Sequence, residues 1–136
     1  MNDRREFLRM SLLAAGAAVV ARPASALATT AGFPPGIVYT AAAPGKWAGK
    51  EGSHAPKVAV EGKKVTVTTA HPMSEKHFIV RHTVVAADGT VIGAKTFFPT
   101  DTEAVSSFDL PDGSSGTFRA TSFCNLHDFW LTEFAV

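Results

Sequence analysis

The residues of this chain that are best suited to chemistry gather in three short segments. They are His54-Ala55-Pro56, His71-Pro72-Met73 with His77, and Cys124-Asn125-Leu126-His127. A thiolate and an imidazole three positions apart, in a turn between strands, can reach the same metal ion. Pro72 breaks regular structure, so the two histidines around it can project from one loop. Imidazole suits zinc, copper, iron and nickel, and a single soft thiolate among several imidazoles suits a redox metal.

Each histidine taken alone is more often a loop or hydrogen-bonding residue than a ligand. Their joint occurrence beside the only cysteine of a 136-residue chain reverses that expectation and predicts a metal site. His82 lies outside the three segments, and we interpret it as a structural or exposed residue. Met73 is interpreted as a packing residue rather than a ligand.

Two longer segments resemble the signature motifs of superoxide reductases, the neelaredoxin and desulfoferrodoxin family. They read His71-Pro72-Met73-Ser74-Glu75-Lys76-His77-Phe78-Ile79 and Cys124-Asn125-Leu126-His127-Asp128-Phe129-Trp130. His54-Ala55-Pro56 resembles the upstream His-x-Pro element of that family. The resemblance covers residues 46–134.

The resemblance implies one mononuclear iron site per chain, with four imidazole nitrogens in a plane and one sulfur below it. By matching position, the equatorial ligands are His54, His71, His77 and His127, and the axial ligand is Cys124. It implies that ferrous iron gives one electron to superoxide, which takes up two protons and leaves as hydrogen peroxide. The resemblance also implies a homo-oligomer and a periplasmic electron donor, which the sequence does not identify. We expect the backbone N–H of Asn125 to donate to the thiolate and tune it.

The chain departs from the family pattern beside the first ligand. The family usually has Glu-Lys directly before the His-x-Pro histidine, where the glutamate caps ferric iron and the lysine attracts superoxide. Here Gly52-Ser53 precede His54, and Lys50 and Glu51 stand two residues further upstream in the opposite order. We predict that Glu51 and Lys50 take these catalytic roles, with Lys76 as a rival cation. Asp128 stands where the family favours glycine, which predicts a slower enzyme.

Two other functions stay open at this point. A blue-copper electron carrier also combines a β-sandwich with a Cys–His loop and an upstream histidine, but it usually adds a methionine after the last histidine. This chain has no methionine beyond Met73 and two more candidate histidines than copper needs. A protein that binds copper or iron without superoxide turnover is the other alternative.

The first 28 residues predict a twin-arginine signal peptide. Arg4-Arg5 and Phe7-Leu8 precede an apolar run of about 11 residues, which is short of the roughly 20 that span a bilayer. Ala26-Leu27-Ala28 matches an A-x-A cleavage site, so we place cleavage after Ala28, with Ala26 as the alternative. Cleavage removes four arginines and two acidic residues, which leaves nine basic and ten acidic residues. We therefore expect a periplasmic protein without a stable membrane anchor.

The chain after residue 28 has two parts, and both must position the ligands. Residues 29–56 are rich in Ala, Gly, Pro and Thr, and they predict an extended N-terminal arm that carries one ligand. Residues 57–136 alternate in short β-rich runs with turn signals such as Asp88-Gly89, which predict about seven strands. Such a pattern favours an all-β, immunoglobulin-like sandwich. Since no basic run or stripe is present, the sequence gives no indication of nucleic-acid binding.

Overall fold

Strands with alternating buried and exposed side chains build the interior of this protein. A computed structural model describes residues 32–136, and in it β3 (Lys64–Thr69) and β7 (Thr117–Cys124) bury every second side chain. Successive side chains of a strand point to opposite faces, so each strand turns one row towards the interior. The predicted signal peptide, residues 1–28, lies outside the described residues.

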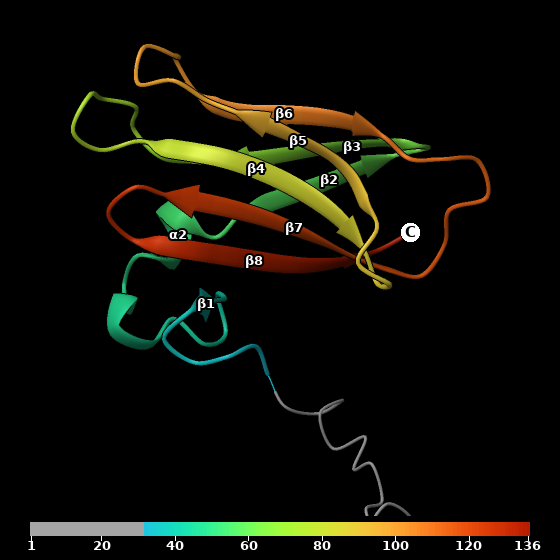
Figure 1. The fold of residues 1–136 in the computed structure, drawn as a ribbon, viewed down its shortest axis with the longest axis horizontal. Coiled ribbons are helices and arrows are strands. Elements are labelled where there is room, and N and C mark those ends of the chain that lie inside the picture. The colour runs from blue at the N-terminus through green and yellow to red at the C-terminus, as the bar shows by residue number, and fades with distance from the viewer. Residues whose placement is uncertain (1–31) are drawn as a thin grey trace, which may run out of the picture. The chain divides into compact units, whose positions relative to one another are not determined.

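The strands form two sheets, which confirms the predicted β-sandwich (Figure 1). One sheet has five strands in the order β1–β8–β7–β4–β5, and the other has three in the order β2–β3–β6. Their remaining bounds are β1 (Val38–Tyr39), β2 (Lys57–Glu61), β4 (Ile79–Ala86), β5 (Val91–Thr96), β6 (Ala104–Asp109) and β8 (Asp128–Ala135). Every pairing is antiparallel except the short parallel pairing of β1 with β8.

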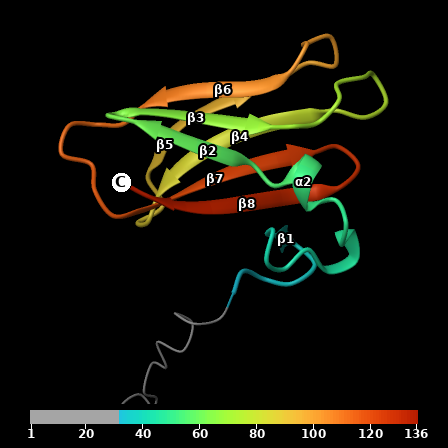
Figure 2. The ribbon, with the colours of Figure 1, turned by 180° about the vertical axis from the view of Figure 1, so that it is seen from behind.

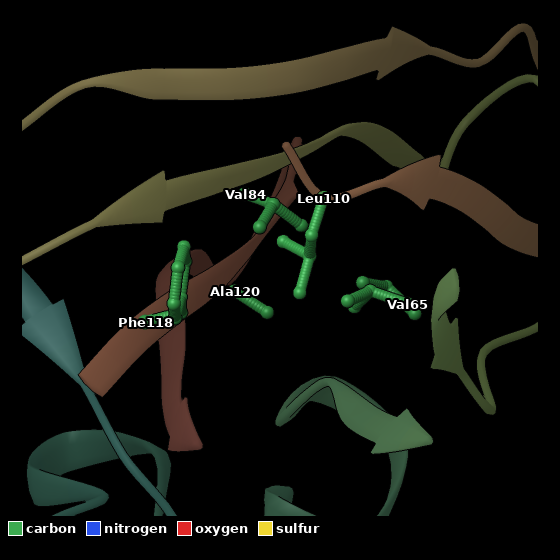
Figure 3. Close-up of a cluster of buried hydrophobic side chains, with 6 residues drawn as sticks. Val65, Val84, Leu110, Phe118 and Ala120 are labelled. Atoms are coloured by element: carbon green, nitrogen blue, oxygen red, sulfur yellow. The ribbon is translucent and has the colours of Figure 1, made fainter. Parts of the chain in front are cut away.

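One apolar cluster joins the two sheets in the interior (Figure 3). It consists of Val65, Val67, Val84, Leu110, Phe118 and Ala120. Burying a large apolar side chain completely contributes roughly 1.5–3 kcal/mol, so this cluster gives the sandwich much of its stability. The sheets can therefore serve as a rigid frame for the loops at their ends.

A second cluster lies towards the end of the sandwich where β7 finishes. Its members are Ile79, Phe97, Ala104 and Cys124, and Met73 packs against them, as expected of a packing residue. Ile79 is paired with Cys124 across β4 and β7. The only cysteine of the chain is thus the last residue of a central strand, with apolar side chains on its inner side.

The arm that precedes the sandwich contains more structure than the sequence predicts. Its described part, residues 32–56, includes β1, a 3-10 turn η2 (Gly45–Trp47) and one helical turn α2 (Glu51–His54). So short a helix has little stability of its own and depends on tertiary contacts, which the local sequence does not reveal. Figures 1 and 2 both place α2 beside the turn between β7 and β8. Among residues 32–136, no helix is long and apolar enough to cross a bilayer.

Candidate metal centre

Five side chains from separate parts of the chain meet at one end of the sandwich. They are His54, His71, His77, Cys124 and His127, and their potential ligand atoms all lie within 4.8 Å of one another. The structure therefore brings together all five residues that the sequence predicts as ligands. His54, His71 and Cys124 are buried, whereas His77 and His127 are partly exposed. One side of the cluster is consequently open to solvent.

The fold explains why these segments meet. His54 ends α2, and His71 follows the end of β3 by two residues. Cys124 ends β7 and pairs with Asp128 at the start of β8, so His127 lies in the tight turn between them. Because β4 runs antiparallel to β7, the loop that carries His77 enters β4 beside the end of β7.

The side chain of Asn125 joins two of the ligand loops. Its Oδ1 accepts a hydrogen bond from the N–H of Phe78 at 3.0 Å, and its Nδ2 donates to the carbonyl of Lys76 at 3.0 Å. The N–H of His77 in turn donates to the carbonyl of Ser74 at 3.1 Å, and closes a turn. These contacts fix the position of His77 relative to Cys124.

The imidazole nitrogens lie at distances that suit a common metal ion. Nδ1 of His127 is 3.0 Å from Nε2 of His54 and 2.9 Å from Nε2 of His77. Nε2 of His77 is 3.0 Å from Nε2 of His71. Two nitrogens about 3.0 Å apart can each lie about 2.1 Å from one ion, which matches a bond between imidazole and a divalent metal such as zinc.

Hydrogen bonds alone cannot explain these approaches. A ring nitrogen has one in-plane position, which either donates or accepts a hydrogen bond. Nδ1 of His127 and Nε2 of His77 each face two other ring nitrogens, so one in-plane position at each cannot serve both approaches as ordinary hydrogen bonds. A cation at the centre would attract all four lone pairs at once. The donor set therefore fits a bound metal.

The protonation of His54 is fixed by the backbone. Its Nδ1 lies 3.1 Å from the carbonyl oxygen of Lys50, which can only accept, and 2.8 Å from Oγ of Ser53. The Ser53 hydroxyl donates to the same carbonyl at 3.2 Å, so its oxygen also faces Nδ1 as an acceptor. Nδ1 therefore carries the hydrogen, and Nε2 presents its lone pair to the cluster. Burial lowers the pKa of His54 to about 4, with a smaller contribution from the neighbouring His71. His54 is accordingly neutral at pH 7, as a metal ligand must be.

The sulfur lies beside the ring nitrogens. Sγ of Cys124 is 3.6 Å from Nδ1 of His127 and 4.0 Å from Nε2 of His71. Burial raises the pKa of the Cys124 thiol, while the backbone N–H groups of Leu126 and His127 act against this increase. A bound cation would favour the thiolate instead, because metal binding releases the thiol proton.

The prediction for Asn125 is wrong in one respect. Its backbone N–H donates to the carbonyl of Phe78 at 3.2 Å and not to the sulfur. The pairing of β4 with β7 continues to this residue and takes up the N–H, so the N–H groups that favour the thiolate are those of Leu126 and His127.

The number of imidazoles in the cluster differs from that of a blue-copper site. Four imidazoles lie beside the sulfur, which is two more than a blue-copper site uses.

A comparison with protein families gives a match over most of the chain. The family model described as Desulfoferrodoxin matches residues 46–133. This chain belongs to the desulfoferrodoxin family. The match spans all five clustered side chains, from His54 to His127. A search of curated proteins finds no match.

The fold of this chain is similar to the solved structures of several superoxide reductases. A single-residue variant of the superoxide reductase (neelaredoxin) from Ignicoccus hospitalis is 25% identical, with a TM-score of 0.66 over 73% of this chain and 92% of that chain. A variant of the neelaredoxin from Archaeoglobus fulgidus in the reduced form is 25% identical, with a TM-score of 0.56 over 64% of this chain and 90% of that chain. The one-iron superoxide reductase from Giardia intestinalis, 24% identical, supports the fold, with a TM-score of 0.57 over 62% and 98%.

Lys50 and Glu51, the predicted catalytic pair of this desulfoferrodoxin chain, lie just before His54 in different surroundings. The positive charge of Lys50 helps to lower the pKa values of His71 and His127 and opposes the increase that burial causes in the pKa of Cys124, so it acts on the cluster. The carboxylate of Glu51 accepts a hydrogen bond from the N–H of Gly49 at 3.1 Å. Its own N–H and that of Gly49 lower its pKa. In this structure the Glu51 carboxylate thus folds back onto the backbone just before α2.

Sequence reasoning missed one contact beside the cluster. Trp47 packs edge-on against His127, with 4.6 Å between the ring centroids, and its indole N–H donates to Asp128 at 3.0 Å. Lys46 forms an ion pair with the same carboxylate at 3.2 Å. A lone tryptophan in an Ala- and Gly-rich segment was the signal that could have revealed it. Asp128 therefore has a structural role at the rim of the site, although the family favours glycine there.

Proposed function

We propose that this protein reduces superoxide to hydrogen peroxide at one iron ion held by His54, His71, His77, His127 and Cys124. The observation that carries the proposal is the convergence of four imidazoles and one sulfur within 4.8 Å, in a chain that matches the desulfoferrodoxin model. Iron at this site would supply the single electron that superoxide needs, and would change from ferrous to ferric. With two protons from solvent, superoxide then becomes hydrogen peroxide.

The residues of the chain prepare the site for this reaction. Neutral imidazoles leave the centre without the positive charges that would repel a cation, and burial lowers the pKa values of His54, His71 and His127 accordingly. An anionic sulfur stabilises the ferric state more than the ferrous state, and so favours donation of the electron. The exposed side at His77 and His127 gives superoxide and water a path to the centre.

Lys50 supplies the positive charge that attracts the superoxide anion in this proposal. Its charge acts on three of the five clustered groups, which supports this role. Local charge matters here because the chain without residues 1–28 has no net positive charge to steer an anion. Glu51 is the candidate cap for ferric iron, and this role requires its carboxylate to leave Gly49.

The site also needs partners outside the chain. We propose that export by the twin-arginine route delivers the protein to the periplasm, on the basis of Arg4-Arg5 and the A-x-A site at Ala26-Leu27-Ala28. A periplasmic reductant must return one electron for each superoxide consumed. Assembly into a homo-oligomer belongs to the same proposal.

Two measurements on the purified protein test the site. The iron content should be one ion per chain, and oxidation should produce a broad visible band from thiolate-to-ferric charge transfer. Replacement of Cys124 by Ser should abolish this band, whereas His82→Gln, which leaves all five donor atoms in place, should retain a band. Iron content well below one per chain, or a band that survives in the Cys124→Ser variant, would refute the proposed ligand set.

A further inference from the structure

His82 is buried between the two sheets and lies outside the cluster of five. Its ring is fully buried, its Nε2 lies 2.9 Å from Oγ1 of Thr69, and its Nδ1 lies 2.8 Å from Oγ of Ser106. Burying polar groups costs free energy unless each is hydrogen-bonded, and an apolar residue would fill the same space without that requirement. The polar network around His82 therefore calls for an explanation other than packing.

The hydrogens of this network run in one direction. The hydroxyl of Thr69 donates to Oγ of Ser122 at 2.8 Å, so the same oxygen accepts from Nε2–H of His82. Nδ1 then accepts from the hydroxyl of Ser106. Burial, with a smaller effect from Lys95, lowers the pKa of His82 to about 4, so the ring is neutral and keeps this single arrangement. A fully satisfied buried network of this kind specifies one geometry of the core.

The network crosses the sandwich at the end that carries the ligands. Thr69 and Ser106 belong to β3 and β6 of the smaller sheet, whereas His82 and Ser122 belong to β4 and β7 of the larger sheet. His82 thus holds one sheet to the other at this level. Three hydrogen bonds of 2.8–2.9 Å therefore connect the two sheets and fix their spacing here.

Two members of the network, Thr69 and Ser122, lie next to ligands of the metal centre. The carbonyl of Thr69 accepts the N–H of His71 at 2.8 Å, so the position of Thr69 determines that of His71. Ser122 lies two residues before Cys124 on the same buried face of β7. The ring of Phe97 packs edge-on against His82 at 4.8 Å and belongs to the apolar cluster that contains Cys124.

We propose that His82 is a positioning residue that sets the separation between Sγ of Cys124 and Nε2 of His71, which is 4.0 Å in this structure. His71 follows β3 of the smaller sheet, and Cys124 ends β7 of the larger sheet. His82 bonds to Thr69 of β3, and its own strand, β4, is paired with β7. The proposal rests on the proposed function, because it concerns how the sulfur and the imidazole hold iron. Its expected consequence is a change in the strength of the iron–sulfur interaction when the network is broken.

Three substitutions in the full chain test this role. His82→Leu removes both hydrogen bonds of the ring, Thr69→Val removes the hydroxyl that joins His82 to Ser122, and His82→Gln retains one donor and one acceptor. The readouts are the position of the thiolate-to-ferric band and the rate at which ferrous iron passes to a chelator. We expect His82→Leu and Thr69→Val to shift the band in the same direction and to release iron about 10- to 100-fold faster. His82→Gln should restore part of both properties.

Val84→Ala is the matched control. Val84 lies two residues further along β4 on the same buried face, but it packs in the apolar cluster away from the hydroxyls. It should lower the thermal stability of the fold while leaving the band and the iron release rate as in the parent protein. If His82→Leu does not fold, His82→Gln and Thr69→Val carry the comparison.

The possible outcomes separate this proposal from the proposed function. Normal iron binding by the parent protein, with the band and the release rate unchanged in the variants of His82 and Thr69, would overturn the positioning role alone. Equal effects from Val84→Ala would also overturn it, since they would show a general response to a weakened core. Failure of the parent protein to bind iron would overturn both.

Discussion

The indole N–H of Trp47 donates to the carboxylate of Asp128 at 3.0 Å, although 81 positions separate the two residues. Asp128 has a φ of 66°, a left-handed conformation that aspartate tolerates better than most residues but at a cost of about 1 kcal/mol or more. The carboxylate also pairs with Lys46 at 3.2 Å. Asp128 thus attaches the arm to the turn that carries His127.

Asp128→Gly is expected to loosen the metal centre without harming the fold. Glycine adopts the backbone conformation freely, so the loss of two contacts is partly offset and thermal unfolding should change little. Trp47 would no longer be held against His127, and iron release to a chelator should become roughly tenfold faster. Asp128→Asn keeps an acceptor for Trp47 and loses the charge that pairs with Lys46, so its release rate should be intermediate. A glycine variant that retains iron as firmly as the parent protein would contradict this role.

Lys50→Ala is expected to slow the reaction with superoxide at low salt. The charge of Lys50 reaches three groups of the cluster, and local positive charge raises the rate of encounter with an anion. We predict a rate constant lower by a factor of about ten or more at low ionic strength, and a smaller difference at high ionic strength because salt screens the charge. Pulse-generated superoxide mixed with the ferrous protein gives this rate constant.

Lys63→Ala is the control for Lys50. It removes the same charge from the turn between β2 and β3, at the opposite end of β3 from His71, where Lys63 pairs with Asp112. The rate constant with superoxide should stay at the value of the parent protein. Equal effects of the two substitutions would show that net charge matters and that the position of Lys50 does not.

The stability of the metal-free protein should fall with acid, in part because of His82. Its pKa is about 4 in the fold and close to 6.5 in the unfolded chain, so the unfolded chain binds the proton first as the pH falls. The neutral ring makes its full contribution to the free energy of unfolding above pH 6.5. As the pH falls from 6.5 to 4, this free energy decreases by about 3 kcal/mol. Denaturant unfolding at pH 7 and at pH 4 measures this change.

Glutamine at position 82 does not titrate, which isolates the effect of the histidine. The difference in the free energy of unfolding between the parent protein and His82→Gln should shrink by about 3 kcal/mol from pH 7 to pH 4. The other histidines are present in both proteins and cancel in the comparison. A difference that is the same at the two pH values would contradict a buried, neutral His82.

Export should depend on the paired arginines. With Arg4→Lys and Arg5→Lys together, we predict that the chain stays in the cytoplasm with residues 1–28 attached. The parent chain should appear in the periplasm with Thr29 as its first residue, or Leu27 if cleavage follows Ala26. Cell fractionation and the mass of the purified protein check both points. Periplasmic recovery of the double variant would contradict the twin-arginine route.

The sandwich was predictable because its signals are local. Alternation in runs such as Lys64–Thr69 and turn signals such as Asp88-Gly89 determine strands wherever an apolar interior is available. The convergence of the five donors was predictable only as a set, because no spacing along the chain places His54 beside His127. Their motifs, together with the resemblance to one family, supplied that information.

The parts that escaped prediction depend on contacts between distant segments. α2 forms a single turn, and nothing in its four residues predicts a helix without the surroundings of His54. The contact between Trp47 and Asp128 and the network of His82 have the same character, since each joins segments that are remote in the chain. Strand β1 has only two residues and pairs with β8 in parallel, which no alternation could indicate.

The most direct test of the account is the product yield when the ferrous protein consumes superoxide. Reduction at the proposed centre consumes one superoxide, one electron and two protons for each hydrogen peroxide, so the account predicts one peroxide per superoxide and no molecular oxygen. One iron should become ferric for each superoxide consumed. A yield of half a peroxide per superoxide with release of oxygen, or iron that stays ferrous, would contradict the account.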